Sequence, residues 1–492
     1  MTAVLAVDQG TTATKAVLVS PEGETVAFAS VPVQRSYPSP GRVEQDPVDL
    51  WESVLNAVAQ LPKAEVSCVA VANQRESVVI WDRRTGLPLT PCVSWQCNRG
   101  AGLCRELRAA GADGLVRELT GLPLDPMFSA SKLSQLLGAD AGLRLAAARG
   151  DVCAGTVDSW LAWNLSGGSL HVTDAGNASR TLLFDIRRLE WSEALLDLFE
   201  IPAALLPGIV ASSQVIGDTR AAGVPAAPIA ALAADSHAAL YGLGCLRAGT
   251  AKATYGTGTS VASPTGGVVG HSRNGLAATL AWLHGSPTYA LEGNVYSSGA
   301  TVEWLARLLG LEGASAVERL AATVSDSGGA HIVPGFAGLG APYWRPEARG
   351  LIAGLTFGTG AGQLARAAIE SIAFQVADLV DALDTDVGRP VEELRADGGP
   401  TSNDVLMQLQ ADLLGRPIVR TRAPDAAALG AAFLGGLATG VFTDEATVEE
   451  LGRRGDRVEP HMTAGHRQEL LSAWHAAVSR VTGLGEPESG TH

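Results

Sequence analysis

Apolar residues near the start of the chain form two short runs separated by a polar segment. The runs cover residues 3–7 and 16–19, and the segment between them, Asp8-Gln-Gly-Thr-Thr-Ala-Thr-Lys15, holds one glycine and three threonines. Two aliphatic and β-branched runs joined in this way predict a β-hairpin. The strand pattern continues over residues 24–33, so we expect a further arm of the same sheet there.

Strand and helix patterns alternate after the hairpin. Asp46-Pro47 has the residue types of a helix cap and first turn, which predicts a helix from there to about residue 61. Residues 66–72 and 229–233 have the composition of buried strands, and the second strand delivers Asp235 at its C-terminal end. Residues 100–150 look helical, and we expect them to form an insertion on the substrate side. This alternation predicts an α/β architecture.

The second half of the chain, from about residue 243, shows apolar positions at helical spacing. Residues 362–383 predict one long packing helix, and residues 407–414 predict another. Residues 426–432 are small apart from Leu429, and we expect a helix that approaches its neighbours closely. We therefore expect a domain over residues 1–242, a second over residues 243–482, and a disordered tail over residues 483–492.

A second turn rich in Gly and Thr, Thr254-Tyr-Gly-Thr-Gly-Thr-Ser260, resembles the polar segment at the start of the chain. In the first turn, Gly10 lets the backbone approach an anion closely, and the neighbouring threonines and Lys15 add donors and positive charge. Asp8 carries the charge that suits a Mg²⁺ ion bridging phosphates. Two such turns, one in each half, indicate a nucleotide held between two similar domains.

Composition and charge favour an enzyme that acts on small molecules. The 492 residues are 46% hydrophobic and 18% charged, and 51 acidic residues against 36 basic ones give a net charge of −15. A chain of this length fits two domains with ample cores. The negative charge argues against nucleic acid or an anionic membrane as a partner.

The cysteines and the N-terminus bear on location. Six cysteines show neither a Cys-x-x-Cys pair nor a metal-ligand spacing with histidine, so we expect buried thiols in a reducing cytoplasm. The first apolar run lacks a preceding basic region and ends at Asp8, so we do not expect a signal peptide. The Ala-rich stretch near residues 224–246 is interrupted by prolines, Asp235 and His237, and predicts no transmembrane helix.

The residue types needed for phosphoryl transfer are all present, although neither a P-loop nor a Gly-x-Gly-x-x-Gly motif after a strand occurs. Phosphoryl transfer needs donors to the phosphates, a divalent cation and a base for the acceptor hydroxyl. The two turns, Asp8 and Asp235 could supply them.

Ten short motifs resemble, in order, those of the FGGY family of carbohydrate kinases, and most closely its glycerol-kinase branch. The resemblance extends from residue 7 to about residue 442. One such motif could arise by chance, but ten in the family's order could not. The motifs are Asp-Gln-Gly-Thr-Thr (8–12), Tyr-Pro-x-Pro-Gly-x-Val-Glu-x-Asp-Pro (37–47), Asn-Gln-Arg-Glu (73–76), Trp-Gln-Cys (95–97), Gly-Thr-Val-Asp-x-Trp-Leu (155–161), Val-Thr-Asp-x-x-Asn-Ala-Ser-Arg-Thr (172–181), Tyr-Gly-Thr-Gly (255–258), Tyr-Ala-Leu-Glu-Gly (289–293), Gly-Leu-Gly-Ala-Pro-Tyr-Trp (338–344) and Asp-Gly-Gly (397–399).

The resemblance implies two ribonuclease-H-like domains of the actin-like ATPase type, with ATP and Mg²⁺ in the cleft between them. It assigns polyol binding and the catalytic base to residues 1–242 and nucleotide binding to the second domain. Asp235 matches the general base, and Asp8 is expected near the metal. The polyol-binding set is matched by Arg75, Glu76, Trp95 and Asp235, and the nucleotide-binding set by Thr11, Thr12, Ala13, Lys15, Thr257, Gly258, Gly299, Glu303, Gly399 and Asn403.

Four positions depart from the glycerol-kinase pattern. Met127 stands where the pattern has tyrosine, Ser236 where it has glutamine, and Ser260 where it has phenylalanine. Two of these changes remove bulk and one removes a hydroxyl donor, which implies a larger acceptor pocket. Such a pocket could accept a four- or five-carbon polyol or ketose, since loss of a polar contact can shift specificity strongly. Glu303 stands where a glutamine is usual on the nucleotide side.

Three functions follow from these observations. The first is an ATP-dependent kinase for glycerol or a related polyol. Members of the family often self-associate, so a homo-oligomer is one expectation for this chain. The second is a kinase for erythritol, threitol or a pentulose on the same scaffold. The third is an actin-like ATPase, chaperone or filament subunit without a sugar substrate, which gives no reason for Arg75, Glu76, Trp95 and Asp235 to occur together.

Overall fold

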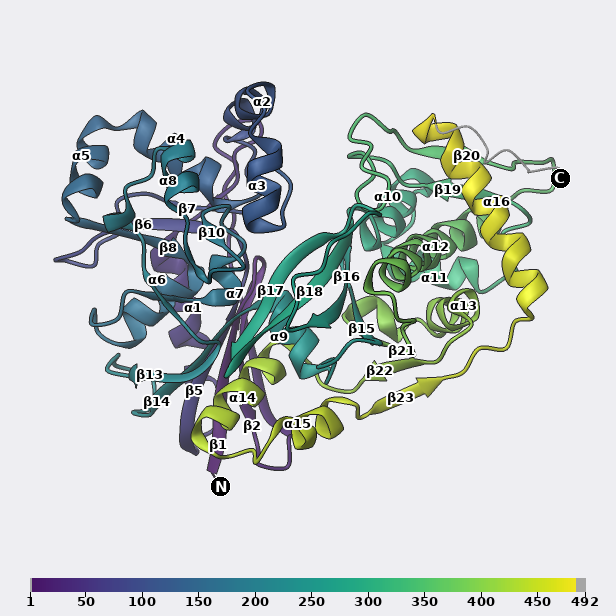
Figure 1. The fold of residues 1–492 in the computed structure, drawn as a ribbon. Helices are drawn as coiled ribbons and strands as arrows, with labels where there is room; N and C mark the ends of the chain where they lie inside the picture. The colour runs from purple at the N-terminus through teal and green to yellow at the C-terminus, as the bar shows by residue number, and fades with distance from the viewer. Residues whose placement is uncertain (1, 484–492) are drawn as a thin grey trace.

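A six-stranded sheet forms the core of the first half of the molecule. The computed structural model describes residues 2–483 (Figure 1). In this sheet three strands form an antiparallel meander, two run parallel to the first strand, and an antiparallel strand closes the edge. In sheet order the strands are β13 (Ser213–Asp218), β14 (Pro228–Ala234), β5 (Glu65–Asn73), β1 (Thr2–Gln9), β2 (Ala13–Val19) and β3 (Thr25–Pro32).

A seven-stranded sheet in the second half repeats this plan. From β23 to β18 it has the same succession of antiparallel, parallel and meander strands, and β17 is an additional edge strand. The expected pair of similar α/β domains is therefore confirmed. In sheet order the strands are β17 (Ala277–His284), β18 (Ser286–Val295), β16 (Thr259–Gly266), β15 (Thr250–Tyr255), β21 (Glu393–Asp397), β22 (Ile418–Thr421) and β23 (Gly455–Val458).

The predicted N-terminal hairpin is present as β1 and β2. Asp8 lies opposite Lys15 in the antiparallel register, and Gly10 N donates to Ala13 O at 3.0 Å to close the turn. From Ala3 onward the residues of β1 are buried, because helices cover both faces of the sheet (Figure 1). This double coverage explains the nearly continuous apolar run in the sequence.

The predicted helices are also found, with small shifts at their ends. Asp46 caps α1 (Pro47–Ala59) by accepting a hydrogen bond from Val48 N at 2.8 Å. The long packing helix is α12 (Ala361–Val387), which ends at Gly388 in the left-handed conformation. The helix predicted at residues 407–414 begins earlier, as α13 (Asp404–Leu414).

One helix of the second half packs beneath the sheet of the first. α14 (Ala426–Thr439) contacts β1, β5 and β14, and crosses α9 (Asp235–Gly242) (Figure 1). The helices approach so closely that a Cβ atom at Gly430 would lie 1.7 Å from Ala238 O. The small residues predicted to allow close approach therefore join the two halves below the cleft.

The insertion predicted between residues 100 and 150 is helical, and it packs beside a small sheet in the first half. Its helices are α2 (Ala101–Ala109), α3 (Asp113–Thr120), α4 (Ser129–Ala139) and α5 (Ala141–Arg149), and the small sheet holds β4 (Glu44–Gln45), β7 (Cys92–Val93), β6 (Val78–Asp82) and β8 (Val152–Thr156). The remaining longer helices are α6 (Val157–Leu165), α8 (Glu193–Phe199), α10 (Gly299–Leu309), α11 (Ala314–Ala321), α15 (Glu445–Gly452) and α16 (Ala464–Thr482), and the short elements are α7 (Ala175–Ala178), β9 (Val172–Asp174), β10 (Phe184–Asp185), β11 (Glu190–Trp191), β12 (Gly208–Val210), β19 (His331–Val333) and β20 (Leu351–Ala353).

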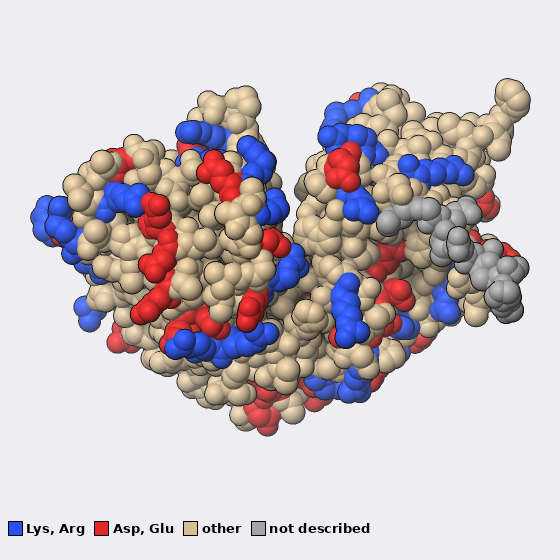
Figure 2. All heavy atoms as spheres, turned by 45° about the horizontal axis from the view of Figure 1, so that its top comes forward, with Lys and Arg blue, Asp and Glu red and all other residues tan. Residues whose placement is uncertain are grey.

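A deep notch separates the two halves on one face of the molecule, and charged side chains of both signs lie along its rims (Figure 2). All six cysteines are buried and unpaired. None of the helices formed by residues 2–483 has the length and apolar character needed to cross a membrane. The predicted disordered tail lies, from residue 484 on, outside the described residues.

Candidate active site

Three adjacent parallel strands of the first sheet end side by side, and each leads to charged residues. Asp8 lies at the end of β1, Arg75 and Glu76 follow β5, and Asp235 follows β14. The register places Asp8 beside Ala72 on β5, so the three strand ends share one edge. Ligands bind at this edge in open α/β sheets.

Arg75 links the two carboxylates predicted to act on the acceptor. Its Nε lies 3.7 Å from Glu76 Oε1 and 3.7 Å from Asp235 Oδ1. Ser236 N donates to Asp235 Oδ1 at 2.7 Å, and the Asp235 side chain retains 36% of its exposure. Partial burial raises the pKa of Asp235, whereas Arg75 opposes the rise. The structure thus brings these predicted residues together around an accessible carboxylate.

Glu76 is held in an unusual backbone conformation. Its φ angle is +61°, which is rare for a residue other than glycine and typical of functional sites. The Glu76 carbonyl accepts hydrogen bonds from Ser129 Oγ at 3.1 Å and from the buried Lys132 Nζ at 3.3 Å. Lys132 also donates to the backbone oxygen of Met127. One buried ammonium therefore fixes the backbone at two predicted acceptor-site positions.

Two site residues, Arg180 and Glu292, were missed as functional residues by the sequence analysis. Arg180 Nε donates to Glu76 Oε1 at 2.8 Å, and Glu292 receives both Nη atoms of Arg75, at 2.6 and 3.0 Å. Burial works against the charge of Glu292, but Arg75 and Arg180 hold its pKa well below the ordinary value. Both residues lie within the family motifs given above. For Glu292 the available signal was a charged residue between Leu291 and Gly293 in an otherwise apolar strand.

Trp95 connects the acceptor side to the first turn. Its Nε1 donates to Thr11 Oγ1 at 2.9 Å, and the Thr11 carbonyl accepts a hydrogen bond from Gln45 Nε2 at 3.0 Å. Trp95 and Met127 are both half-buried. The ring predicted to contact the acceptor is therefore tied to a residue predicted to contact phosphate.

Ser236 and Ser260 meet across the two halves. Their Oγ atoms are 3.1 Å apart, and the buried Lys252 donates to Ser236 Oγ at 2.8 Å. Ser260 Oγ lies 3.5 Å from the same ammonium. Two of the positions that depart from the expected pattern therefore form one polar cluster with a lysine that the sequence analysis did not assign.

The predicted metal position lies in a buried charged cluster. Lys15 Nζ is 3.2 Å from Asp8 Oδ2 and is also paired with Asp425, the N-cap of α14. Burial and the neighbouring Asp425 raise the pKa of Asp8, and Lys15 opposes this. Burial disfavours the charge of Lys15, but Asp8 and Asp425 hold its pKa above the ordinary value.

The Asp8 carboxylate suits a Mg²⁺ ion. Among the described residues, Asp8 Oδ1 is buried without a hydrogen-bond partner, as is Asp397 Oδ1 on the facing domain. No group of three or more metal-ligating side chains is found within residues 2–483. Mg²⁺ commonly binds one or two carboxylates and completes its shell with water and phosphate oxygens. A magnesium site of that kind fits these residues.

The second turn packs against the N-terminus of α10. Gly299 N donates to Gly256 O at 3.0 Å, and Ala300 N donates to the carbonyl of the exposed Thr257 at 3.1 Å. A Cβ atom at Gly258 would lie 2.5 Å from Val295 O. Only glycine fits this approach, and the turn carbonyls accept the first N–H groups of α10, which holds the turn against that helix.

The remaining predicted nucleotide contacts occupy different environments. Gly399 is open, and a Cβ atom there would meet no atom within 4 Å. Asn403 caps α13 by accepting from Leu406 N at 3.1 Å, which leaves its amide nitrogen for a ligand. Thr12 is exposed and Ala13 half-buried. The exposed Glu303 accepts from Ala314 N at 3.3 Å, so its carboxylate contacts the start of α11 instead of another predicted site residue.

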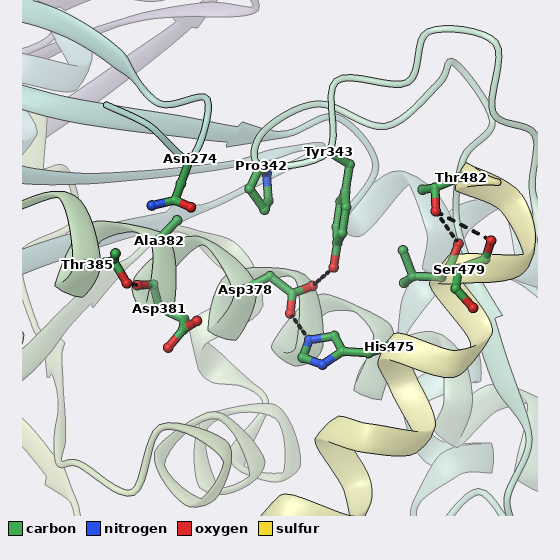
Figure 3. Close-up of a pocket in the computed structure, with 11 residues that line it drawn as sticks. Asn274, Pro342, Tyr343, Asp378, Asp381, Ala382, Thr385, His475, Ser479 and Thr482 are labelled. Carbon is green, nitrogen blue, oxygen red and sulfur yellow. Dashed lines mark hydrogen bonds and ion pairs between the residues drawn. The ribbon is translucent and has the colours of Figure 1, made fainter. Parts of the chain in front are cut away.

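A separate pocket of about 350 Å³ lies in the second domain, between α12, α16 and the loop at residues 342–343 (Figure 3). Asp378 at its base accepts hydrogen bonds at 2.8 Å from each of Tyr343 Oη, Trp474 Nε1 and His475 Nε2. These contacts satisfy the carboxylate and tie α16 to α12. No predicted site residue lines this pocket, so the candidate active site stays with the residues that meet between the two halves.

Comparisons with known proteins show which family this chain resembles. The N-terminal domain of the FGGY family of carbohydrate kinases matches residues 3–242, and the C-terminal domain of that family matches residues 251–439. A glycerol kinase of Dechloromonas aromatica (strain RCB) is 48% identical, with 97% of each chain covered. A glycerol kinase of Trichlorobacter lovleyi is 46% identical over 99% of this chain and 100% of that one.

The fold also matches a solved kinase structure. A crystal structure of Plasmodium falciparum glycerol kinase with ADP superimposes with a TM-score of 0.92 at 32% identity, covering 98% of both chains. Both family domains, the near full-length relatives and the cleft between two related sheets lead to one conclusion. The chain belongs to the FGGY family of carbohydrate kinases.

Proposed function

We propose that this enzyme transfers the γ-phosphoryl group of ATP to a hydroxyl of glycerol or a closely related small polyol. The observation that carries the proposal is the convergence of Arg75, Glu76 and Asp235 on one sheet edge, beside Asp8 and the first turn. The high identity to two glycerol kinases supports the choice of acceptor. The solved Plasmodium falciparum glycerol kinase with ADP supports ATP as the donor.

The acceptor would be oriented by three residues. Glu76 Oε1 already accepts from Arg180, and we assign the other oxygen to acceptor hydroxyls. Arg75, which is 10% exposed, would donate to a further oxygen while its Nη atoms stay paired with Glu292. Trp95 would lie against the carbon chain. Such orientation contributes strongly to rate because it replaces a bimolecular encounter with a fixed geometry.

Asp235 would remove the proton of the reacting hydroxyl. Its Oδ1 is occupied by Ser236 N, and we assign proton transfer to Oδ2. The proton would pass from the hydroxyl to this carboxylate as the acceptor oxygen attacks the γ-phosphorus and ADP leaves. A base positioned in this way contributes about 10²–10⁴-fold.

The two turns would bind the phosphates from opposite sides of the cleft. Thr11 and Lys15 lie on the first turn and Thr257 on the second, and their donors would stabilise the charge on the transferred group. Asp8 would hold the Mg²⁺ ion, which neutralises phosphate charge when it is bound. Gly399 and the Asn403 amide would lie against the adenosine. We place the reaction in the cytoplasm, since six buried free thiols suit a reducing compartment.

The proposal is tested with purified enzyme, ATP, Mg²⁺ and a panel of three- to six-carbon polyols and ketoses. Phosphorylated acceptor is measured by mass spectrometry and ADP by a coupled assay. We expect ADP and phosphorylated acceptor in equal amounts. Release of ADP and inorganic phosphate without any dependence on an acceptor would contradict the proposal and favour an actin-like ATPase.

A further inference from the structure

A buried lysine with hydroxyl partners lies directly behind the acceptor site. Lys252 on β15 has no exposed surface, and its ammonium donates to Ser236 Oγ at 2.8 Å and Thr254 Oγ1 at 2.9 Å, with Ser260 Oγ at 3.5 Å. Burial lowers the pKa of Lys252, and Asp397 and Glu292 oppose this without forming an ion pair with it. Its three N–H donors thus match three hydroxyl oxygens.

The ammonium determines where the hydroxyl protons point. An ammonium can only donate, so each of the three hydroxyls uses an oxygen lone pair toward Lys252. Thr254 lies opposite Asp397 in the parallel register, so that carboxylate is the available acceptor for its proton. Ser236 and Ser260 are 3.1 Å apart, and one of them donates to the other. The second serine then has both lone pairs occupied, and its proton is left to donate outward.

The serine pair lies where the two halves of the molecule meet, beside the proposed base. Ser236 and Ser260 are half-buried, and Ser236 adjoins Asp235, whose carboxylate its backbone nitrogen contacts at 2.7 Å. The roles proposed for Arg75, Glu76 and Asp235 already use the three oxygens of glycerol. The serine pair therefore offers a donor that three-carbon acceptors leave unpaired, and an unpaired partly buried polar group costs affinity.

We propose that Lys252, acting through Ser236 and Ser260, makes this end of the pocket a hydrogen-bond donor that selects an open-chain acceptor of four or five carbons with a fourth oxygen. This inference rests on the proposed phosphoryl transfer and names its substrate class. The fourth oxygen can belong to a hydroxyl or a carbonyl, so polyols and ketoses share the required chemistry. Lys252 is a positioning residue because it reaches the acceptor only through the serines.

The test compares kcat/KM for glycerol with kcat/KM for longer acceptors. Erythritol, threitol and ribitol form the polyol arm, and erythrulose and xylulose form the ketose arm. We expect the best longer acceptor to exceed glycerol about 10-fold. Ser260→Ala should lower that ratio about 10-fold, whereas Ser260→Thr, which keeps the hydroxyl, should preserve it. Ser263→Ala is the matched control, because Ser263 lies on the same strand and donates to Thr250 O instead.

Lys252→Met should lower the same ratio of kcat/KM values. If the Lys252→Met protein does not fold, the serine variants alone test the inference. A wild-type preference for glycerol over every longer acceptor would overturn the inference. An equal loss for all acceptors in Ser260→Ala would also overturn it. Failure to phosphorylate any acceptor would instead overturn the proposed function, and the inference with it.

Discussion

Arg75 and Glu292 form a two-point ion pair between the two halves of the molecule. Arg75 follows β5 of the first sheet, and Glu292 lies within β18 of the second. The Nη1–Oε2 and Nη2–Oε1 distances are 2.6 and 3.0 Å, and the Glu292 side chain is fully buried. Because Arg75 also contacts Glu76 and Asp235, this pair links domain arrangement to acceptor-site geometry.

Glu292→Gln should destabilise the protein by about 3–5 kcal/mol, because it removes the two-point carboxylate partner of the buried Arg75 guanidinium. The measurement is the free energy of unfolding in denaturant. Glu190→Gln is the control, since Glu190 pairs with Arg188 at the surface with both side chains more than half exposed, and its loss should cost less than about 1 kcal/mol. Equal effects of the two changes would mean that the pair is not buried in solution.

Asp235→Asn should lower kcat about 10²–10⁴-fold and leave ATP binding nearly unchanged, because the amide cannot accept the hydroxyl proton. Steady-state kinetics and ATP titration measure the two quantities. Asp218→Asn is a suitable control, since that exposed residue lies on the edge strand β13. A raised KM at full kcat would remove Asp235 from the role of base.

The value of kcat/KM should decline at acidic pH, and the pKa of Asp235 should set the pH at which it declines. Burial raises that pKa above the ordinary aspartate value, Arg75 and Lys252 lower it, and Glu76 raises it; Asp235 and Asp8 also repel each other. The active form is ionised, so kcat/KM should decline as pH falls through this pKa. Lys252→Met removes a stabilising positive charge and should move the decline to higher pH. An unchanged or opposite shift in the pH profile would contradict this assignment.

Restoring bulk in the acceptor pocket should favour glycerol. The triple change Met127→Tyr, Ser236→Gln and Ser260→Phe refills the space and removes the serine pair. We expect the ratio of kcat/KM for glycerol to that for four-carbon polyols to rise about tenfold or more. If competition assays with the two acceptors give the same preference before and after the change, these positions do not set acceptor size.

Gly398→Ala should weaken ATP binding. Gly398 has a φ of +96°, and a Cβ atom there would lie 1.9 Å from Tyr255 O, so alanine would displace the second turn. Displacement of about 1 Å can cost 10²-fold in rate, and we expect at least about a tenfold rise in the KM for ATP. Gly138→Ala in α4, where a Cβ atom meets nothing within 4 Å, is the control. Wild-type ATP kinetics in Gly398→Ala would contradict the proposed phosphate site.

Local patterns predicted the elements of this fold well. The hairpin at Asp8–Lys15, the capped helix after Asp46 and the strand leading to Asp235 follow from spacing and residue type within short windows. The duplicated sheet was expected from two similar turns and from the family motifs. What these patterns convey is the identity of each element and the residues at its ends.

Contacts between distant segments could not be predicted in the same way. Arg75 and Glu292 are 217 positions apart in the sequence. The sequence around Lys252 shows only one charged residue within a strand. Likewise, nothing in the small residues of α14 shows that they pack beneath the first sheet instead of the second. These relations depend on how the two halves are placed, which periodicity within one element does not encode.

The central claim is that an alcohol in this cleft receives the terminal phosphoryl group of ATP with Asp235 as base. The most direct measurement follows ³²P from γ-labelled ATP in the wild-type enzyme and Asp235→Asn, with glycerol and longer acceptors present. The account predicts label on the carbon acceptor in the wild type and about 10²–10⁴-fold slower labelling in the variant. Label recovered only as inorganic phosphate, or equal labelling rates in both proteins, would contradict it.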